Sequence, residues 1–277
     1  MMETLRESHT SLLVATPERE SRVFGAEFEV RTDTGMDHSI PVSPLPTEAA
    51  KEERIRPEDQ TERFSHDYTD PLFSREQVSY AFMKRAFDVT ICGLALLVFA
   101  PIMLVVALAI RLTSKGPIIF KQVRVGRGGR FFWCYKFRSM CVDAEEKKKL
   151  LLHLNEASGP VFKIKRDPRI TKIGSLIRKT SLDELPQLIN ILKGDMSIVG
   201  PRPPIPSEVD KYTSYERGRL AVQPGLTCLW QIGGRSNVSF ERWMELDLQY
   251  IETMTFRNDI RIVLRTVPAV LKGSGSY

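Results

Sequence analysis

The sequence predicts a membrane-associated α/β fold: a proline-broken, re-entrant membrane helix, interfacial amphipathic helices and a small α/β body. Three observations lead to this fold class. Residues 89–110 form a run of 22 residues without a charge. Two short apolar and basic segments flank a glycine-rich turn, as the strands of a hairpin do. Several later segments repeat their apolar residues at helical spacing.

Charge divides the chain into unlike parts. Residues 1–80 hold 9 Lys and Arg against 17 Asp and Glu, whereas the remainder hold 31 against 17. Residues 1–75 are rich in Glu, Ser, Thr and Pro and poor in apolar residues, so we predict an acidic, disordered tail. We place the membrane hairpin at residues 76–115 and the body at residues 116–277.

The apolar run is long enough to cross a membrane. As a straight helix it would measure about 33 Å, against a hydrocarbon core of about 30 Å. Pro101 lies near its middle, where proline removes a backbone donor and clashes with the preceding turn. Basic residues flank both ends, which places both flanks on the cytoplasmic side. We therefore favour a re-entrant hairpin that breaks at Pro101, with a kinked spanning helix as the alternative.

The basic charge of the body indicates which classes of molecule it is suited to bind. An excess of Lys and Arg beside an apolar hairpin suits an anionic bilayer surface and phosphate-bearing substrates. No zinc-ligand spacing, recognition-helix pattern or RNA motif accompanies it, so nucleic acid is not an expected partner. The four cysteines form no C-x-x-C pair and no secretory signal opens the chain, which indicates a reduced, cytosolic setting.

Residues 118–125 and 131–138 are the predicted strands, joined by Gly-Arg-Gly-Gly at residues 126–129. This loop could hold a phosphate through its arginines, but a plain turn explains the glycines equally well. Residues 142–157 are predicted to form a helix with a charged face.

The chemically richest stretch is residues 167–203. Ser181 and Glu184 have the spacing of a capping box, Gly194 is placed to end a helix, and one apolar face is formed by Leu185, Leu188, Ile189 and Leu192. Pro186 fits only in the first turn, so the helix is expected to begin near Leu182 or slightly later. Asp183 and Glu184 would then lie where the helix dipole stabilises negative charge.

Basic residues crowd the same stretch: Arg169, Lys172, Arg178, Lys179 and Arg202. Together with the two carboxylates they indicate either an anion-binding site that contains a carboxylate or a helix cap surrounded by surface charge. The residues alone do not decide between these two interpretations.

The C-terminal region is predicted to be helical. Residues 240–250 mix acidic and apolar side chains at helical spacing. Further on, Arg257, Arg261 and Arg265 share one row, and the opposing apolar face consists of Ile260, Val263, Leu264, Val267 and Leu271. Such a basic amphipathic helix can lie in the membrane interface, and a helix that faces the core is the alternative. Arg235, in a glycine-containing loop, is a candidate substrate contact.

Eight motifs, in one order, give the sequence a specific resemblance: KRAFD at 84–88, KFRSM at 136–140, DPR at 167–169, SLDELPQ at 181–187, GDMS at 194–197, GPRP at 200–203, PGLT at 224–227 and ELD at 245–247. From about Tyr80 to the C-terminus the chain resembles a bacterial sugar transferase, the small monotopic type of polyisoprenyl-phosphate phosphoglycosyl transferase. The resemblance does not cover residues 1–75.

This resemblance implies a reaction. A sugar-1-phosphate would pass from a nucleoside diphosphate sugar to a polyprenyl phosphate, with release of the nucleoside monophosphate. It implies that Asp183 and Glu184 are catalytic, that Mg²⁺ is required and that the membrane helix is re-entrant. We expect Asp183 to attack the sugar-bearing phosphorus, which is nucleophilic catalysis by a carboxylate. Direct attack by the acceptor phosphate is the rival route.

The other residues of the expected site bind phosphate or metal. Asp183 and Glu184 are the metal candidates, and the sequence does not say which of them binds Mg²⁺. The candidates for binding substrate phosphates are Lys136, Arg138, Arg178, Arg202 and Arg235.

We expect the protein at the bacterial inner membrane, with its catalytic body on the cytoplasmic face. The donor is expected to be a UDP-hexose, and the role the first membrane step of exopolysaccharide, O-antigen or glycan assembly. The sequence leaves the oligomeric state open, a homo-oligomer included. The alternative function is a non-catalytic, membrane-anchored protein that binds lipid and a partner.

Overall fold

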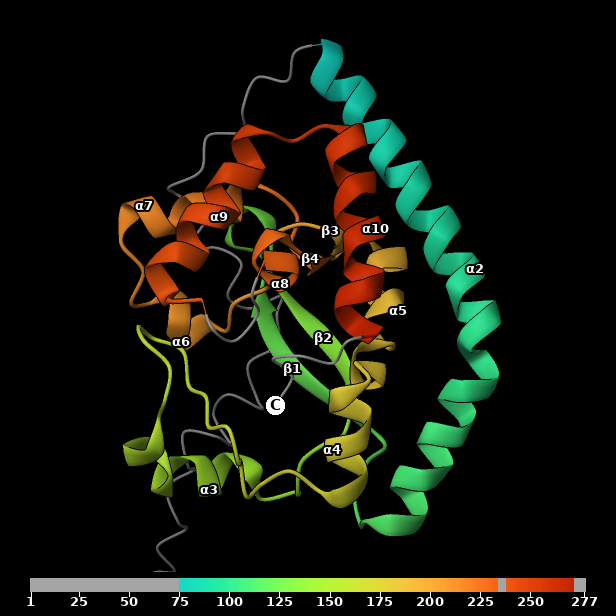
Figure 1. Ribbon diagram of the computed structural model, residues 1–277, viewed down its shortest axis with the longest axis vertical. Helices are drawn as coiled ribbons and strands as arrows, with labels where there is room; N and C mark the ends of the chain where they lie inside the picture. The colour runs from blue at the N-terminus through green and yellow to red at the C-terminus, as the bar shows by residue number, and fades with distance from the viewer. Residues whose placement is uncertain (1–74, 234–237, 272–277) are drawn as a thin grey trace, which may run out of the picture. The chain divides into compact units, whose positions relative to one another are not determined.

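The computed structural model describes residues 75–233 and 238–271 (Figure 1). The predicted acidic tail therefore lies outside the described residues, except for Arg75. The described helices are α2 Arg75–Thr113, α3 Ala144–Leu150, α4 Lys172–Lys179, α5 Gln187–Lys193, α6 Pro206–Val209, α7 Ser214–Arg217, α8 Leu229–Gly233, α9 Phe240–Glu252 and α10 Phe256–Leu271. The strands are β1 Ile119–Val125, β2 Phe131–Phe137, β3 Ser197–Val199 and β4 Gly225–Thr227.

The predicted hairpin of strands is confirmed. β1 and β2 pair antiparallel, with Ile119 opposite Phe137 and Val125 opposite Phe131. A short 3₁₀ turn, Arg127–Gly129, joins them, and Gly128 adopts the left-handed backbone that glycine accepts at least cost (φ 64°). β3 and β4 form a separate parallel pair. The body therefore combines helices with two small sheets.

Among the described residues, α2 is the one helix long and apolar enough to cross a membrane. Pro101 lies inside this helix, and the helical structure is continuous on both sides of it. Figure 1 shows that α2 changes direction about halfway along its length. The helix therefore continues through Pro101 and is not interrupted there, and a proline inside a helix is a common cause of a bend.

Both arms of α2 pack against the same body. Cys92 on the first arm is fully buried in a core cluster with Leu188 and Ile191 of α5. Ile110 on the second arm is buried in another cluster with Phe137 of β2 and with α4. Between these contacts the helix presents exposed apolar side chains, of which Leu97 is 76% exposed. The apolar surface is therefore confined to one side of a helix that is attached at both ends.

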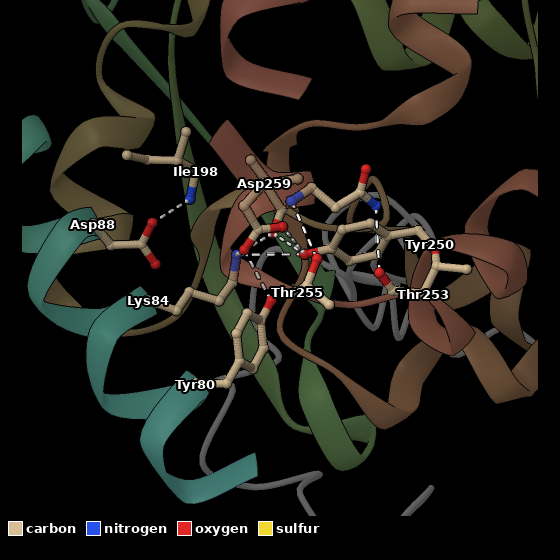
Figure 2. Close-up of polar contacts among 10 residues, drawn as sticks. Tyr80, Lys84, Asp88, Ile198, Tyr250, Thr253, Thr255 and Asp259 are labelled. Atoms are coloured by element: carbon tan, nitrogen blue, oxygen red, sulfur yellow. Dashed lines mark hydrogen bonds and ion pairs between the residues drawn. The ribbon is translucent and has the colours of Figure 1, made fainter. Parts of the chain in front are cut away.

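A polar network fixes the first arm to the body (Figure 2). Lys84 Nζ donates to Asp259 Oδ2 of α10 at 2.8 Å, and Tyr80 donates to the same oxygen at 2.8 Å. Tyr250 of α9 donates to Asp259 Oδ1 at 2.9 Å. One turn beyond Lys84, Asp88 accepts a hydrogen bond from a backbone N–H of β3 at 3.1 Å. This network joins α2, α9, α10 and β3, and β3 leads directly into the GPRP loop.

The predicted C-terminal helices are confirmed as α9 and α10, and the face that α10 buries is not the apolar row that the core-facing alternative would bury. Ile262 is 1% exposed and Asp259 is buried, whereas Leu264 and Val267 are exposed. The core-facing row thus includes a charged residue that accepts hydrogen bonds from its neighbours, which apolar spacing alone could not reveal. The helix predicted at residues 142–157 is also shorter than expected, with α3 followed by a 3₁₀ turn, Leu152–Leu154.

Gly174 gives a test of how α4 is positioned. Thr171 caps α4 by accepting a hydrogen bond from Gly174 N, and a Cβ at Gly174 would lie 1.8 Å from the backbone oxygen of Ser139. We expect Gly174→Ala to displace α4 and lower the stability by about 1–3 kcal/mol, as overpacking does. Thermal unfolding of the purified protein measures this. Gly233→Ala, where no atom lies within 4 Å, is the matched control, and equal melting temperatures would contradict the expectation.

Candidate active site

The two acidic residues of the SLDELPQ motif lie in a tight turn between α4 and α5. Leu182–Glu184 form a 3₁₀ turn, and α5 begins only at Gln187. Ser181 adopts a left-handed backbone (φ 58°) and caps nothing with its side chain, so the predicted capping box is wrong. The helix starts after Pro186 because proline has no N–H to donate to a preceding turn. The predicted end at Gly194 is confirmed (φ 88°).

The two carboxylates have different surroundings. Asp183 is 7% exposed, whereas Glu184 is partly exposed and accepts a hydrogen bond from Lys136 Nζ at 2.6 Å. Lys136 reaches this turn from β2, 48 residues earlier in the chain. The hairpin therefore supplies the cation that pairs with the second carboxylate, while the first is buried without that short contact.

These surroundings shift the two pKa values in opposite directions. Burial raises the pKa of Asp183 to about 6, Lys136 and Arg178 oppose the rise, and the charge of Glu184 adds to it. Burial also acts to raise the pKa of Glu184, but Lys136 and Arg202 outweigh it and the pKa is lowered. Near neutral pH, Glu184 is thus held as an anion, and Asp183 is a carboxylate of unusually high basicity.

Arg202 is brought to this site by the GPRP loop. Its guanidinium lies 3.7 Å from Glu208 and over the ring of Trp243, and its charge acts on Glu184. Two buried arginines fix the loop, since Arg219 donates to the Arg202 carbonyl at 2.8 Å and Arg124 donates to the next carbonyl at 2.7 Å. The first residue of the loop also lies close to β4, because a Cβ on Gly225 of β4 would lie 2.1 Å from Gly200 N.

The other residues predicted to bind substrate phosphates lie in different surroundings. Arg178 lies on α4 close enough for its charge to act on Asp183. Arg138 is buried and donates to the backbone oxygen and the hydroxyl of Ser114, at 2.9 and 2.6 Å. Those contacts hold one guanidinium nitrogen at the end of α2, and its role as a phosphate ligand stays a prediction. Arg235 lies outside the described residues.

Sequence reasoning missed one cation of this site. Lys163 is partly buried, and its pKa is lowered to about 8 by burial and by the charges of Arg178 and Arg202. No repeat or motif marked it, because its neighbourhood depends on how the preceding loop folds. We refer to Lys136, Lys163, Arg178 and Arg202 as the cationic cluster.

The carboxylates can be tested for fit to a metal ion. Within residues 75–233 and 238–271, no three His, Cys, Asp or Glu side chains converge as an all-protein metal site would require. Magnesium, however, keeps several waters and is usually held by one or two carboxylates with substrate phosphates. Asp183 and Glu184 fit that pattern, since Asp183 is a buried carboxylate whose raised pKa indicates too little compensating positive charge.

Comparison with known proteins places the chain in a family. Residues 79–273 match the family described as bacterial sugar transferase. The chain is 50% identical over 199 residues to the galactosyl transferase CpsE of Streptococcus agalactiae, covering 72% of this chain and 44% of that protein. It is 42% identical over 207 residues to an undecaprenyl-phosphate galactose phosphotransferase of Salmonella typhimurium, covering 72% and 42%.

A third relative is matched over more of its length. The chain is 39% identical over 210 residues to a UDP-glucose:undecaprenyl-phosphate glucose-1-phosphate transferase of Caulobacter vibrioides, covering 73% of this chain and 74% of that protein. The chain thus spans less than half the length of the first two relatives and about three quarters of the third. From the extent of the family match and these identities, the chain belongs to the bacterial sugar transferase family.

Proposed function

We propose that this chain transfers a sugar-1-phosphate from a nucleoside diphosphate sugar, with a UDP-hexose as the expected donor, to a polyprenyl phosphate. The observation that carries the proposal is the buried Asp183 carboxylate beside Glu184, within a cationic cluster suited to phosphates. The names of two relatives, which include undecaprenyl phosphate and in one case UDP-glucose, support the choice of substrates. The role would be the first membrane step of exopolysaccharide, O-antigen or glycan assembly.

Two displacements at phosphorus account for the transfer. An oxygen of Asp183 attacks the phosphorus that bears the sugar, and the bond from that phosphorus to the nucleoside monophosphate breaks. The nucleoside monophosphate leaves with the bonding electron pair. An oxygen of the polyprenyl phosphate then attacks the same phosphorus, which releases the Asp183 carboxylate and forms the lipid-linked diphosphate sugar.

The remaining residues of the site position and neutralise charge, which is the main need of phosphoryl transfer. Lys136 holds Glu184 as an anion beside Asp183, and Arg202 offers a bidentate fork to a phosphate. Asp183 and Glu184 would hold Mg²⁺ together with the donor's phosphates, and when bound the ion neutralises diphosphate charge.

The membrane geometry belongs to the same proposal: α2 enters the bilayer from one face and returns to it. Cys92 and Ile110 would lie about 27 Å apart along a straight helix, which is close to the thickness of a bilayer core. Yet both are buried against one body that carries many charges. A spanning helix would draw that body into hydrocarbon. The exposed Leu264 and Val267 of α10, which contacts α2, would extend the membrane-facing surface into the interface.

This topology is tested with two single cysteines at exposed positions, one on each arm of α2. Phe82→Cys and Leu112→Cys replace side chains that are 75% and 76% exposed. In a background with Cys141→Ser, we expect a membrane-impermeant maleimide to label neither in intact spheroplasts and both after permeabilisation. Labelling of one position alone in intact cells would show that the ends lie on opposite sides of the membrane.

The reaction is tested by supplying polyprenyl phosphate with a panel of nucleoside diphosphate sugars and measuring release of the nucleoside monophosphate. We expect release that depends on the acceptor lipid, with UDP-hexoses as the best donors. A chain that binds lipid vesicles but releases nothing from any donor would favour the non-catalytic alternative.

The raised pKa of Asp183 predicts an acidic limit to the reaction. The carboxylate must be ionised to attack phosphorus, and with a pKa of about 6 it is mostly protonated at pH 5, where an ordinary aspartate is ionised. We expect the rate of nucleoside monophosphate release in a single turnover without acceptor to fall about tenfold from pH 7 to pH 5. A rate that stays constant down to pH 5 would contradict this assignment.

A further inference from the structure

Three arginines lie in one row on the outer face of α10. Arg257, Arg261 and Arg265 are spaced four residues apart, and all three are exposed. Asp259 and Ile262, on the other side of the helix, are each 1% exposed. Like charges four residues apart on a helix repel one another. The row, which we call the arginine row, therefore does not serve the stability of α10.

No acidic side chain offsets these charges within residues 75–233 and 238–271. The positions three and four residues before and after each arginine hold no Asp or Glu, so no ion pair can form along the helix. Asp259, the one acidic residue of α10, faces the other way and accepts hydrogen bonds from Tyr80, Lys84 and Tyr250. The arginine row also forms no ion pair with any other described residue. It is thus available to an anion from outside this part of the chain.

An apolar stripe separates the arginine row from α2, beside which α10 lies (Figure 1). Phe256 meets Phe87 of α2 edge-on, with ring centroids 5.5 Å apart, so this side of α10 faces the membrane helix. With about 100° between successive residues, Val267 and Leu264 follow Phe256 around the helix and Arg257 comes next. Val267 and Leu264 are 56% and 67% exposed. The exposed apolar stripe therefore lies next to α2, and the arginines lie along its far edge.

The arginines and the stripe share one open hollow at the surface, which is lined by Arg257, Ile260, Arg261, Leu264 and Arg265. This surface offers guanidinium groups beside exposed apolar side chains. A phospholipid offers the complement, because its phosphate lies beside its acyl chains and guanidinium binds phosphate oxygens in pairs. A soluble anion would use the arginines and leave the apolar side chains in water. The combination of the two therefore favours a lipid.

We propose that the arginine row of α10 binds the headgroup phosphates of anionic phospholipids, next to the point where α2 enters the bilayer. Anionic lipids are favoured over zwitterionic ones because each basic residue near a negatively charged membrane surface adds to the attraction. This inference rests on the membrane geometry proposed above and does not depend on the transfer reaction. It adds a lipid preference to the surface that surrounds the membrane helix.

The test measures which lipid gathers at α10 in the full chain. Val267→Cys, in the Cys141→Ser background where the other cysteines are buried, is labelled with a fluorophore and reconstituted into phosphatidylcholine vesicles. Nitroxide-labelled phosphatidylglycerol or nitroxide-labelled phosphatidylcholine is then added as the quencher. We expect phosphatidylglycerol to be enriched at the fluorophore by on the order of fivefold or more, which is about the contribution of one basic residue. The enrichment should fall as the salt concentration rises.

A second labelling site and three variants serve as controls. A fluorophore at Leu97→Cys, which is 76% exposed on α2, should be quenched equally by both lipids. Combined Arg257→Gln, Arg261→Gln and Arg265→Gln should abolish the enrichment at Val267→Cys, and the corresponding three lysine substitutions should keep most of it. Removal of three other exposed charges, by Lys165→Gln, Lys211→Gln and Arg242→Gln, should leave the enrichment unchanged. Melting temperatures check that each variant is folded.

Four results would overturn the proposal. Equal quenching at Val267→Cys by the two lipids would show no preference for anionic headgroups. Enrichment that survives the three glutamine substitutions would place the lipid elsewhere. Equal loss in the variant with the three other charges removed would assign the effect to net charge alone. Displacement of the labelled phosphatidylglycerol by a trace of polyprenyl phosphate would assign the row to the acceptor lipid. If neither lipid quenches the fluorophore at Val267→Cys or at Leu97→Cys, the membrane geometry itself fails, and the two failures are thus distinguished.

Discussion

Asp183→Asn is expected to abolish transfer, with a loss on the order of 10⁴-fold or more in the release of nucleoside monophosphate. Asparagine keeps the shape of the side chain but is far too weak a nucleophile to attack the phosphorus. The wild type, incubated with a donor labelled in its sugar phosphate and without acceptor, should carry close to one equivalent of covalent label. Hydroxylamine should remove this label, because an acyl phosphate is cleaved by that nucleophile.

Glu184→Gln is the matched control for this experiment. It removes the neighbouring charge but leaves the Asp183 carboxylate in place, so we expect slower labelling and not its absence. Label on Asp183→Asn equal to that on the wild type would refute the nucleophile assignment. Normal transfer with no label on any form would favour direct attack by the acceptor phosphate.

Asp183→Asn should remain folded, so that its loss of transfer activity can be distinguished from a loss of structure. The pKa of Asp183 in the folded protein, about 6, lies above its ordinary value of 3.8. The protonated form is therefore the more stable one in the fold, and that stability is lost as the pH rises from about 4 through 6. At pH 7.5 asparagine is neutral and avoids the cost of a buried charge. We expect Asp183→Asn to melt no lower than the wild type at that pH.

The elements that the sequence predicted well are those whose signals are local. The β1–β2 hairpin follows from two short apolar and basic segments around a glycine turn, and the end of α5 follows from Gly194. The predicted start of α5 was wrong. Ser181 and Glu184 have the spacing of a capping box, but the helix begins after Pro186 and Ser181 does not cap it. A spacing that fits a motif does not fix the backbone when a stronger constraint lies within the same turn.

The candidate site was predictable in part, for the same reason. Asp183, Glu184 and Arg202 stand in motifs, and the structure brings them into range of one another's charge. Arg138 also stands in a motif, yet its guanidinium is engaged by Ser114, 24 residues away. Lys163 stands in none and reaches the site through a loop that folds on α9. Contacts between distant parts of the chain leave no periodic signal in a single sequence.

The buried pair of Arg219 and Asp247 is the clearest such contact, and its loss should have the largest effect on stability. Arg219 Nη2 lies 2.6 Å from Asp247 Oδ2, and the two side chains are 0% and 1% exposed. Removing one partner leaves the other charge buried and uncompensated, which typically costs about 3–5 kcal/mol. We therefore expect Arg219→Met to lower the melting temperature by on the order of 10 °C. The fluorescence of Trp230 and Trp243, whose rings lie 4.8 Å apart, would report the unfolding.

Removal of both charges should distinguish the effect on stability from the effect on donor binding. Arg219→Met with Asp247→Leu leaves no buried charge behind, so we expect the double variant to regain much of the stability that Arg219→Met loses. Donor binding should be weakened in both the single and the double variant. In both of them the Arg202 carbonyl lacks the hydrogen bond from Arg219 that holds the GPRP loop. Equal stability of the single and double variants would contradict the ion pair as the cause. Full recovery of the donor KM would show that Arg202 needs no such support.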